Sequence, residues 1–97
     1  MLLVLITYDV STQDAAGSRR LRNVARACEA HGQRVQNSVF ECLLTEAQFR
    51  ELQHRLEQII DAENDSLRFY LLGNNYQNKA VHVGAKQTYA PEETLLI

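Results

Sequence analysis

The sequence predicts a small α+β domain, in which an antiparallel sheet carries two helices on one of its faces. Two observations favour this class. Apolar, strand-like segments alternate along the chain with two segments of helical periodicity. With 97 residues, of which 45% are hydrophobic and 23% charged, the chain also has the length and composition of one soluble globular domain, over residues 1–97.

The first expected strand covers residues 1–9. Residues 2–6 are all apolar and rich in strand-favouring types, and the run is too short to span a membrane. An apolar run without alternation is typical of a strand that is covered on both faces. It stops at Tyr8 and Asp9, so a carboxylate follows a buried strand. Taken alone, such an aspartate more often ends a strand or caps a turn than binds a ligand.

A helix is expected over residues 18–31, after a polar loop over residues 10–17, with Gly32 as its C-terminal cap. Its apolar residues have the spacing of one buried helix face and are Leu21, Val24, Ala25 and Cys28. Other positions of the helix carry four arginines, Arg19, Arg20, Arg22 and Arg26. A row of arginines is usually a solvated surface, but near the loop after Asp9 it could also contact phosphate groups.

A second helix is expected over residues 45–61, begun by a capping box between Thr45 and Gln48. The charged residues are distributed unevenly along the chain, although the net charge is only −2. Residues 1–44 contain five arginines and four acids, whereas residues 45–66 contain six acids and two arginines. The sequence therefore predicts a molecule with an arginine-bearing side and an acidic side.

Three further segments have strand character. Residues 34–44 are rich in β-branched and aromatic types, with a turn or kink at residues 37–38. Residues 67–72 form the last strong strand, and residues 81–84 are a candidate short one. With two helices on one face of the sheet, the economical packing is a ferredoxin-like βαββαβ sandwich.

Two helices leave the second face of such a sheet uncovered, and the first and last strands carry apolar residues on both of their sides. We expect a homodimer with facing sheets, because a second copy would bury this face. Residues 81–84 and the apolar tail at residues 94–97 could extend the sheet edge of the partner subunit by strand exchange. Residues from about 80 to 97 are therefore expected to serve dimerisation and partner docking.

The cysteines and histidines indicate no metal site. The spacing of Cys28 and Cys42 is not a zinc pattern, so both are expected to be small buried hydrophobes. His31, His54 and His82 show no ligand spacing with one another. The N-terminus lacks the basic segment and cleavage site of a secretory signal, and a cytoplasmic protein is expected.

Several of these features together resemble the CRISPR-associated protein 2 family, the smaller component of the spacer-acquisition module. They are Tyr8-Asp9 after an apolar strand, the arginine-rich helix, the block GQRVQNSVFEC over residues 32–42, and DSLRFY over residues 65–70. The resemblance covers essentially the whole chain, and the GxRVQxSVFE pattern is its most specific part. Residues 72–76 and 82–84 resemble the subtype that accompanies type I-C systems.

The resemblance implies a ferredoxin-like homodimer that is a metal-dependent endonuclease and docks onto the larger CRISPR integrase to capture and insert spacer DNA. In that family the aspartate at the strand end is the catalytic metal ligand, which is Asp9 here. The preceding tyrosine and the arginine and phenylalanine of the block also affect activity, and these are Tyr8, Arg34 and Phe40. Two Asp9 carboxylates across a two-fold axis would supply a pair of ligands for Mg²⁺, with Mn²⁺ as the alternative.

The expected nucleic-acid contacts follow from this arrangement. Arg34, together with Arg19 or Arg22, is expected to hold a phosphate group. Ser38 could hydrogen-bond phosphate, although a turn residue is the better interpretation. Phe40 could stack on a base or pack equally well in the core.

Other functions stay open at this point. The protein could be a non-catalytic scaffold whose arginines clamp the DNA backbone, with Asp9 in a structural role. It could be a regulatory module that binds a small ligand at its dimer interface, although the arginines count against this, or a toxin-like endonuclease of messenger RNA. Duplex DNA is the favoured substrate and single-stranded RNA the alternative. Both stay open, because contacts to the nucleic-acid backbone carry no information about the bases.

Overall fold

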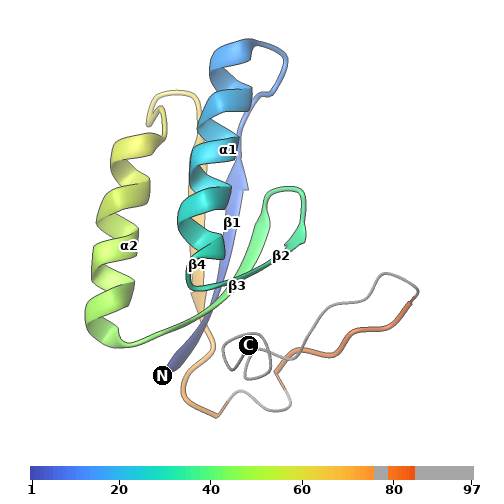
Figure 1. Ribbon diagram of the computed structural model, residues 1–97, viewed down its shortest axis with the longest axis vertical. Coiled ribbons are helices and arrows are strands. Elements are labelled where there is room, and N and C mark those ends of the chain that lie inside the picture. Colours follow the sequence, from blue (N-terminus) through green and yellow to red (C-terminus); the bar gives the residue numbers. More distant parts are fainter. Residues whose placement is uncertain (76–78, 85–97) are drawn as a thin grey trace.

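The computed structural model describes residues 1–75 and 79–84 (Figure 1). Its elements are β1 (Leu2–Asp9), α1 (Ala15–Glu29), β2 (Gly32–Gln36), β3 (Val39–Leu44), α2 (Glu46–Ile59) and β4 (Ser66–Leu71). Both helices lie on the same side of one sheet (Figure 1). The predicted βαββαβ order and the predicted α+β class are therefore confirmed.

The sheet has the strand order β2-β3-β1-β4, and every neighbouring pair is antiparallel. β1 is thus an inner strand, which explains its unbroken apolar run. Its register with β3 includes the pair Thr7 and Val39, and its register with β4 ends at the pair Asp9 and Ser66. The end of β1 at Asp9 is therefore paired with β4 alone, while pairing with β3 stops two residues earlier at Thr7.

The hydrophobic core lies between the sheet and the two helices. β1 contributes its even-numbered residues Val4, Ile6 and Tyr8, and β3 contributes Phe40, Cys42 and Leu44. The predicted stripe of α1 is buried against them, together with Leu52 and Leu56 of α2. Both cysteines are buried and free, as predicted. The side of β1 that carries Tyr8 is thus fixed by close packing.

The first helix differs from the prediction at both ends. It begins at Ala15 rather than residue 18, because the carboxylate of Asp14 accepts a hydrogen bond from the Gly17 N–H at 2.7 Å and caps the helix. It ends at Glu29, and the role of Gly32 as a C-terminal cap was predicted wrongly. A Cβ atom at Gly32 would lie 1.9 Å from the carbonyl oxygen of Glu41, so glycine permits the close approach of β3.

Two other local predictions, the capping box of the second helix and the turn at residues 37–38, are confirmed. The backbone N–H of Gln48 donates to the Thr45 hydroxyl at 3.1 Å, and the Thr45 N–H donates to the Gln48 side chain at 2.9 Å. This is the predicted capping box at the start of α2. Residues 37–38 form the turn between β2 and β3, so the extended segment is a hairpin.

The second face of the sheet is covered by neither helix. We call it the open face and define it by the side chains that alternate away from the core: Leu3, Leu5, Thr7, Asp9, Val39, Glu41, Leu43, Arg68 and Tyr70. Tyr70 is 42% exposed. The face is apolar at Leu3, Leu5, Leu43 and Val39, as predicted, and it also carries charges at Glu41 and Arg68.

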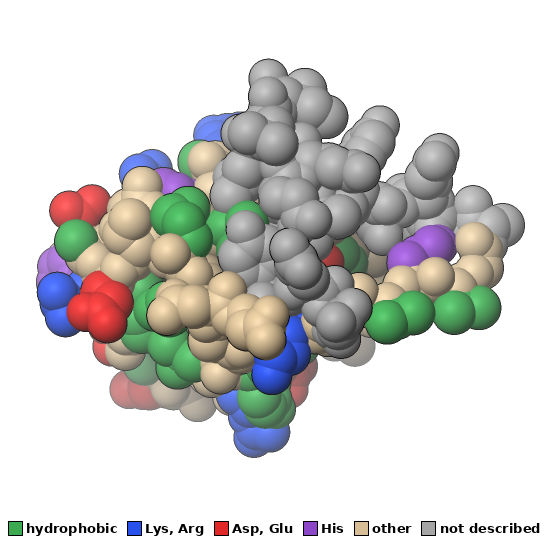
Figure 2. Space-filling view, turned by 90° about the horizontal axis from the view of Figure 1, so that it is seen from below, with side chains coloured by type: hydrophobic (Ala, Val, Ile, Leu, Met, Phe, Trp, Pro, Cys, Tyr) green, Lys and Arg blue, Asp and Glu red, His purple; other side chains and the backbone are tan. Residues whose placement is uncertain are grey.

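The segment that follows Gly73 lies partly outside the described residues. Residues 81–84 do not form the candidate strand, since no strand of the described chain pairs with them. Val81 and Val83 are 82% and 90% exposed, and Figure 2 shows hydrophobic side chains along one side of this projecting segment. Strand exchange through residues 85–97 lies outside the described part. No helix in residues 1–75 or 79–84 is long and apolar enough to cross a membrane.

Candidate metal and nucleic-acid site

Asp9 is the last residue of β1, and its side chain is exposed. Its backbone is held in place by β4 on one side and, at the preceding residue, by the β2–β3 turn on the other. Ser66 of β4 is its cross-strand partner, and the preceding N–H of Tyr8 donates to the carbonyl of Ser38 at 2.9 Å. The Asp9 carboxylate makes no hydrogen bond or ion pair with any residue in the described ranges. A rigid strand end thus presents a carboxylate whose oxygens are open to solvent.

Tyr8 points in the opposite direction, into the core, where its hydroxyl donates to the carboxylate of Asp65. Asp65 also accepts from Arg20 Nε at 2.8 Å and from the Asp61 N–H at 3.0 Å. The side chain of Asp65 is only 1% exposed. This buried network ties the end of β1 to α1 and to the loop before β4.

The network fixes its protonation states at neutral pH. Burial raises the pKa of Tyr8 to about 12, and the hydrogen bond to Asp65 contributes in the same direction. Burial alone would raise the pKa of Asp65, but the hydrogen bonds from Arg20, Tyr8 and Asp61 together lower it. Asp65 is therefore ionised and Tyr8 is protonated, so the tyrosine serves as a hydrogen-bond donor and not as a base near neutral pH.

Arg34 lies on the helix side of the sheet. It is paired with Phe40, which faces the core, and its guanidinium carbon lies 5.8 Å from the centroid of that ring. Its Nε also donates to the carbonyl of Asn37 at 2.7 Å. A groove of about 520 Å³ joins Arg34 to α1, with the lining residues Arg22, Ala25, Arg26, Glu29, Ala30 and Arg34. We call this the arginine groove.

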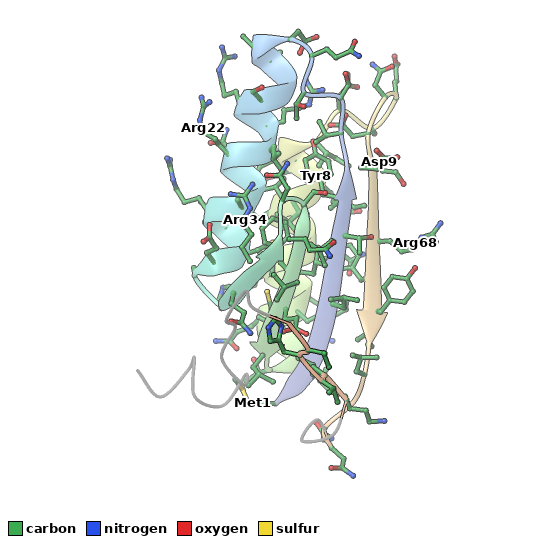
Figure 3. The ribbon with its side chains drawn as sticks, turned by 90° about the vertical axis from the view of Figure 1, so that its right-hand side faces the viewer. Met1, Tyr8, Asp9, Arg22, Arg34 and Arg68 are labelled. Carbon is green, nitrogen blue, oxygen red and sulfur yellow. The ribbon has the colours of Figure 1, made fainter. Side chains whose placement is uncertain are left out.

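The arginine groove and Asp9 lie on opposite sides of the sheet. Figure 3 shows Asp9 and Arg68 on one side, and Arg22 and Arg34 on the other side with α1. Within one protomer the sheet therefore separates Arg34 and Arg22 from Asp9, so the structure does not bring together the residues predicted to hold one phosphate. Arg19 is exposed on α1, outside the groove.

The remaining predicted contact residues are buried or only partly exposed in the structure. Phe40 is fully buried, so core packing is the correct interpretation and base stacking is excluded in this conformation. Tyr8 is 2% exposed and likewise does not reach a nucleic acid. Ser38 is partly exposed in the β2–β3 turn, and its carbonyl supports β1, as expected for a turn residue.

Arg68, Asp65 and Arg20 were not identified as site residues from the sequence. In β4 the segment SLRFYL alternates, with Leu67 and Phe69 against the core and Ser66 and Arg68 on the other side. This alternation could have placed Arg68 on the face of the sheet away from the helices. Its position beside Asp9 depends on the register between β1 and β4, which the alternation does not give.

One protomer offers few side-chain ligands for a metal ion at the strand end. In residues 1–75 and 79–84, no three or more histidine, cysteine, aspartate or glutamate side chains are grouped so that they could bind one. The strand end offers the single exposed carboxylate of Asp9. Magnesium and manganese suit carboxylate oxygens, and magnesium is commonly held by one or two carboxylates together with water and phosphate oxygens. The Asp9 carboxylate thus fits a hard cation whose other ligands would be water, phosphate oxygens or a further carboxylate.

Comparison with known proteins places the chain in one family. Residues 1–80 match the family model described as CRISPR associated protein Cas2. A protein of Nitratidesulfovibrio vulgaris named CRISPR-associated endoribonuclease Cas2 is 56% identical over 99% of this chain and 94% of its own length. A protein of Halalkalibacterium halodurans named CRISPR-associated endonuclease Cas2 is 54% identical over 98% of this chain and 99% of its own length.

Solved structures agree with the fold. The crystal structure of Streptococcus pyogenes Cas2 at pH 6.5 is 57% identical and superposes with a TM-score of 0.77, covering 84% of this chain and 99% of that chain. A chain of a partial Cas6-RT-Cas1–Cas2 complex is 31% identical with a TM-score of 0.58, covering 86% of this chain and 90% of its own.

Proposed function

Because the chain belongs to the CRISPR-associated protein Cas2 family, we propose that it is a metal-dependent endonuclease that hydrolyses phosphodiester bonds of nucleic acid. The observation that carries the proposal is the exposed Asp9 carboxylate at a strand end that β4 and the β2–β3 turn hold in place. Duplex DNA is the favoured substrate. Single-stranded RNA is the alternative, since one close relative is named an endoribonuclease and another an endonuclease.

The active form in this proposal is a two-fold homodimer in which the open faces meet. Neither helix covers this face, which carries Tyr70 at 42% exposure together with the partly buried Leu5 and Val39. A two-fold interface uses the same patch on both copies. Because Asp9 is on the same face and at the end of an inner strand, the two carboxylates can approach each other across the axis.

The roles of the residues follow from their positions. The two Asp9 carboxylates would hold a Mg²⁺ or Mn²⁺ ion, while Tyr8 and Asp65 fix the strand end that carries them. When bound, such an ion activates water as a nucleophile and stabilises charge that develops on the phosphate oxygens. The chain's own contribution is to keep the carboxylates exposed and at a constant separation.

The substitution Asp9→Asn tests the proposal. We expect the variant to remain folded and to cleave on the order of a hundredfold more slowly or not at all, because an amide is a poor ligand for a hard cation. Cleavage of duplex DNA and of single-stranded RNA is measured with and without Mg²⁺ or Mn²⁺. Asp14→Asn is the matched control, since asparagine also caps helices and this aspartate serves only as a cap. Full metal-dependent cleavage by Asp9→Asn would contradict the proposal.

A second candidate is a non-catalytic scaffold that binds DNA within a complex with the larger CRISPR integrase. The arginine groove favours it, because this cationic surface lies away from Asp9 and would bind backbone phosphates without contributing to cleavage. Similarity to a chain of a Cas1–Cas2 complex supports the partner. Spacer integration by the Asp9→Asn variant in the presence of the integrase separates the two functions. Full integration without cleavage would favour the scaffold.

A further inference from the structure

A second hollow adjoins the arginine groove on the helix side of the molecule. It has a volume of about 290 Å³ and lies between the C-terminal end of α1 and the middle of α2, with the lining residues Arg26, Ala27, Ala30, His31, Glu51, Leu52 and Arg55. Arg26 and Ala30 line both hollows, so the two meet along α1. Together they form a path from β2 across α1 to α2. We call it the arginine track, after its four arginines Arg22, Arg26, Arg34 and Arg55.

The track exists because α1 places small side chains beside its arginines. Arg22, Arg26 and Ala30 are spaced by four residues and therefore form one row along the helix surface. The buried Ala25 lies on the side of this row that borders the arginine groove, and the buried Ala27 lies on the side that borders the second hollow. The arginines thus stand beside two depressions that a ligand can enter.

The positive charge of the track is not neutralised within the chain. All four of its arginines are exposed, whereas only two acids line it, Glu29 and Glu51. The one ion pair within residues 1–75 and 79–84 joins Arg20 to Asp65, outside the track. The two glutamates therefore leave the guanidinium groups of the track available for an anion.

The track also stays accessible in the proposed dimer, because it faces away from the open face. Figure 3 shows Arg22 and Arg34 with α1 on one side of the sheet and Asp9 on the other side. Arg34 is oriented before any ligand binds, since its Nε donates to the carbonyl of Asn37 at 2.7 Å. Several spaced cations along one path match the regular phosphates of a nucleic-acid backbone, whereas a single small anion would meet only one or two of them.

We infer that the arginine track binds the phosphate backbone of nucleic acid and is a second site, separate from the cleavage site proposed at Asp9. In a two-fold dimer the two tracks lie on opposite outer surfaces, so one dimer presents two of them. The inference goes beyond the proposed function, because binding at the track requires neither the Asp9 carboxylate nor a metal ion. Backbone contacts do not read the bases, so the binding is independent of sequence.

Titration of the full chain with a short duplex DNA tests the inference. Affinity is measured with a metal chelator present, at several salt concentrations. We expect Arg26→Gln and Arg55→Gln each to weaken binding roughly three- to tenfold and to lower the slope of log K against log salt by about 0.9 for each phosphate that is no longer neutralised. Arg50→Gln is the matched control and should change neither quantity, because this exposed arginine of α2 lines neither hollow.

Three results would overturn the inference. Unchanged affinity and salt slope in the chain that carries both Arg26→Gln and Arg55→Gln would show that DNA binds elsewhere. An effect of Arg26→Gln without any effect of Arg55→Gln would contradict a track that reaches α2. Displacement of the DNA by polyglutamate as readily as by unlabelled DNA would indicate an acidic protein partner instead.

Cleavage assays on the same variants keep this inference distinct from the proposed function. Binding that depends on Arg26 and Arg55, in a chain that cleaves no substrate with Mg²⁺ or Mn²⁺, would support the track and contradict the proposed endonuclease. Metal-dependent cleavage by a chain whose DNA binding is unaffected by both substitutions would support the endonuclease and overturn the track.

Discussion

At the scale of single residues, Tyr8 and Asp9 are adjacent in β1 but face opposite sides of the sheet and have separate roles. Asp9 is exposed and without a partner in the described chain, which leaves its oxygens available for a cation. Tyr8 is buried and bound to Asp65, which Arg20 and the Asp61 N–H also hold. In the proposed site the tyrosine therefore acts through the position of the strand and not by contact with substrate.

This arrangement predicts a pH-dependent contribution of Asp65 to stability. Its pKa is lower in the folded chain than its usual value near 3.8, so the contribution is present above that pH and is lost as the pH falls through the folded value. Asp65→Asn should destabilise the chain by about 2 kcal/mol at pH 7, because charged hydrogen bonds are lost. The difference from the unsubstituted chain should shrink below about pH 4.

Urea unfolding at pH 7 and at pH 3 measures both quantities. Glu57→Gln is a suitable control, since this exposed acid of α2 has no partner in the described residues. A difference for Asp65→Asn that is equally large at both pH values would contradict the role assigned to the ionised carboxylate.

At the scale of the elements, Gly32 shows how a correctly placed residue can be assigned the wrong role. The sequence suggests a helix cap, whereas the structure requires glycine because β3 passes directly beside it. Gly32→Ala should therefore destabilise the hairpin by roughly 1 to 3 kcal/mol, as expected for overpacking. Gln36→Ala, at an exposed position of the same strand, is the control. Equal stability of the two variants in urea unfolding would show that β3 can move away.

The sequence predicted those elements whose determinants are local. The stripe from Leu21 to Cys28 and the capping box at Thr45 depend on residues close together in the chain, and both are correct. The start of α1 was missed because Asp14 caps a helix whose first residues are not apolar enough to show the helical spacing. The separation of Arg34 from Asp9 was missed because it depends on pairing between strands distant in the sequence.

At the scale of the whole molecule, one protomer has a single exposed carboxylate at the end of β1 and one sheet face that its helices leave open. In the proposed dimer, joining the open faces of two copies would bring a second Asp9 carboxylate to the first. The family could be identified from the sequence motifs, but the geometry of the shared site could not, because it depends on contacts between separate chains.

The stoichiometry of metal binding tests the shared site most directly. Titration of the chain with Mn²⁺ in a calorimeter, at a concentration where sedimentation shows the dimer, should give one ion for every two chains. Asp9→Asn should abolish this binding while the dimer persists, because each copy contributes one of the two carboxylates. Binding of one ion per chain, or binding that survives Asp9→Asn, would contradict a metal site that two copies of Asp9 share.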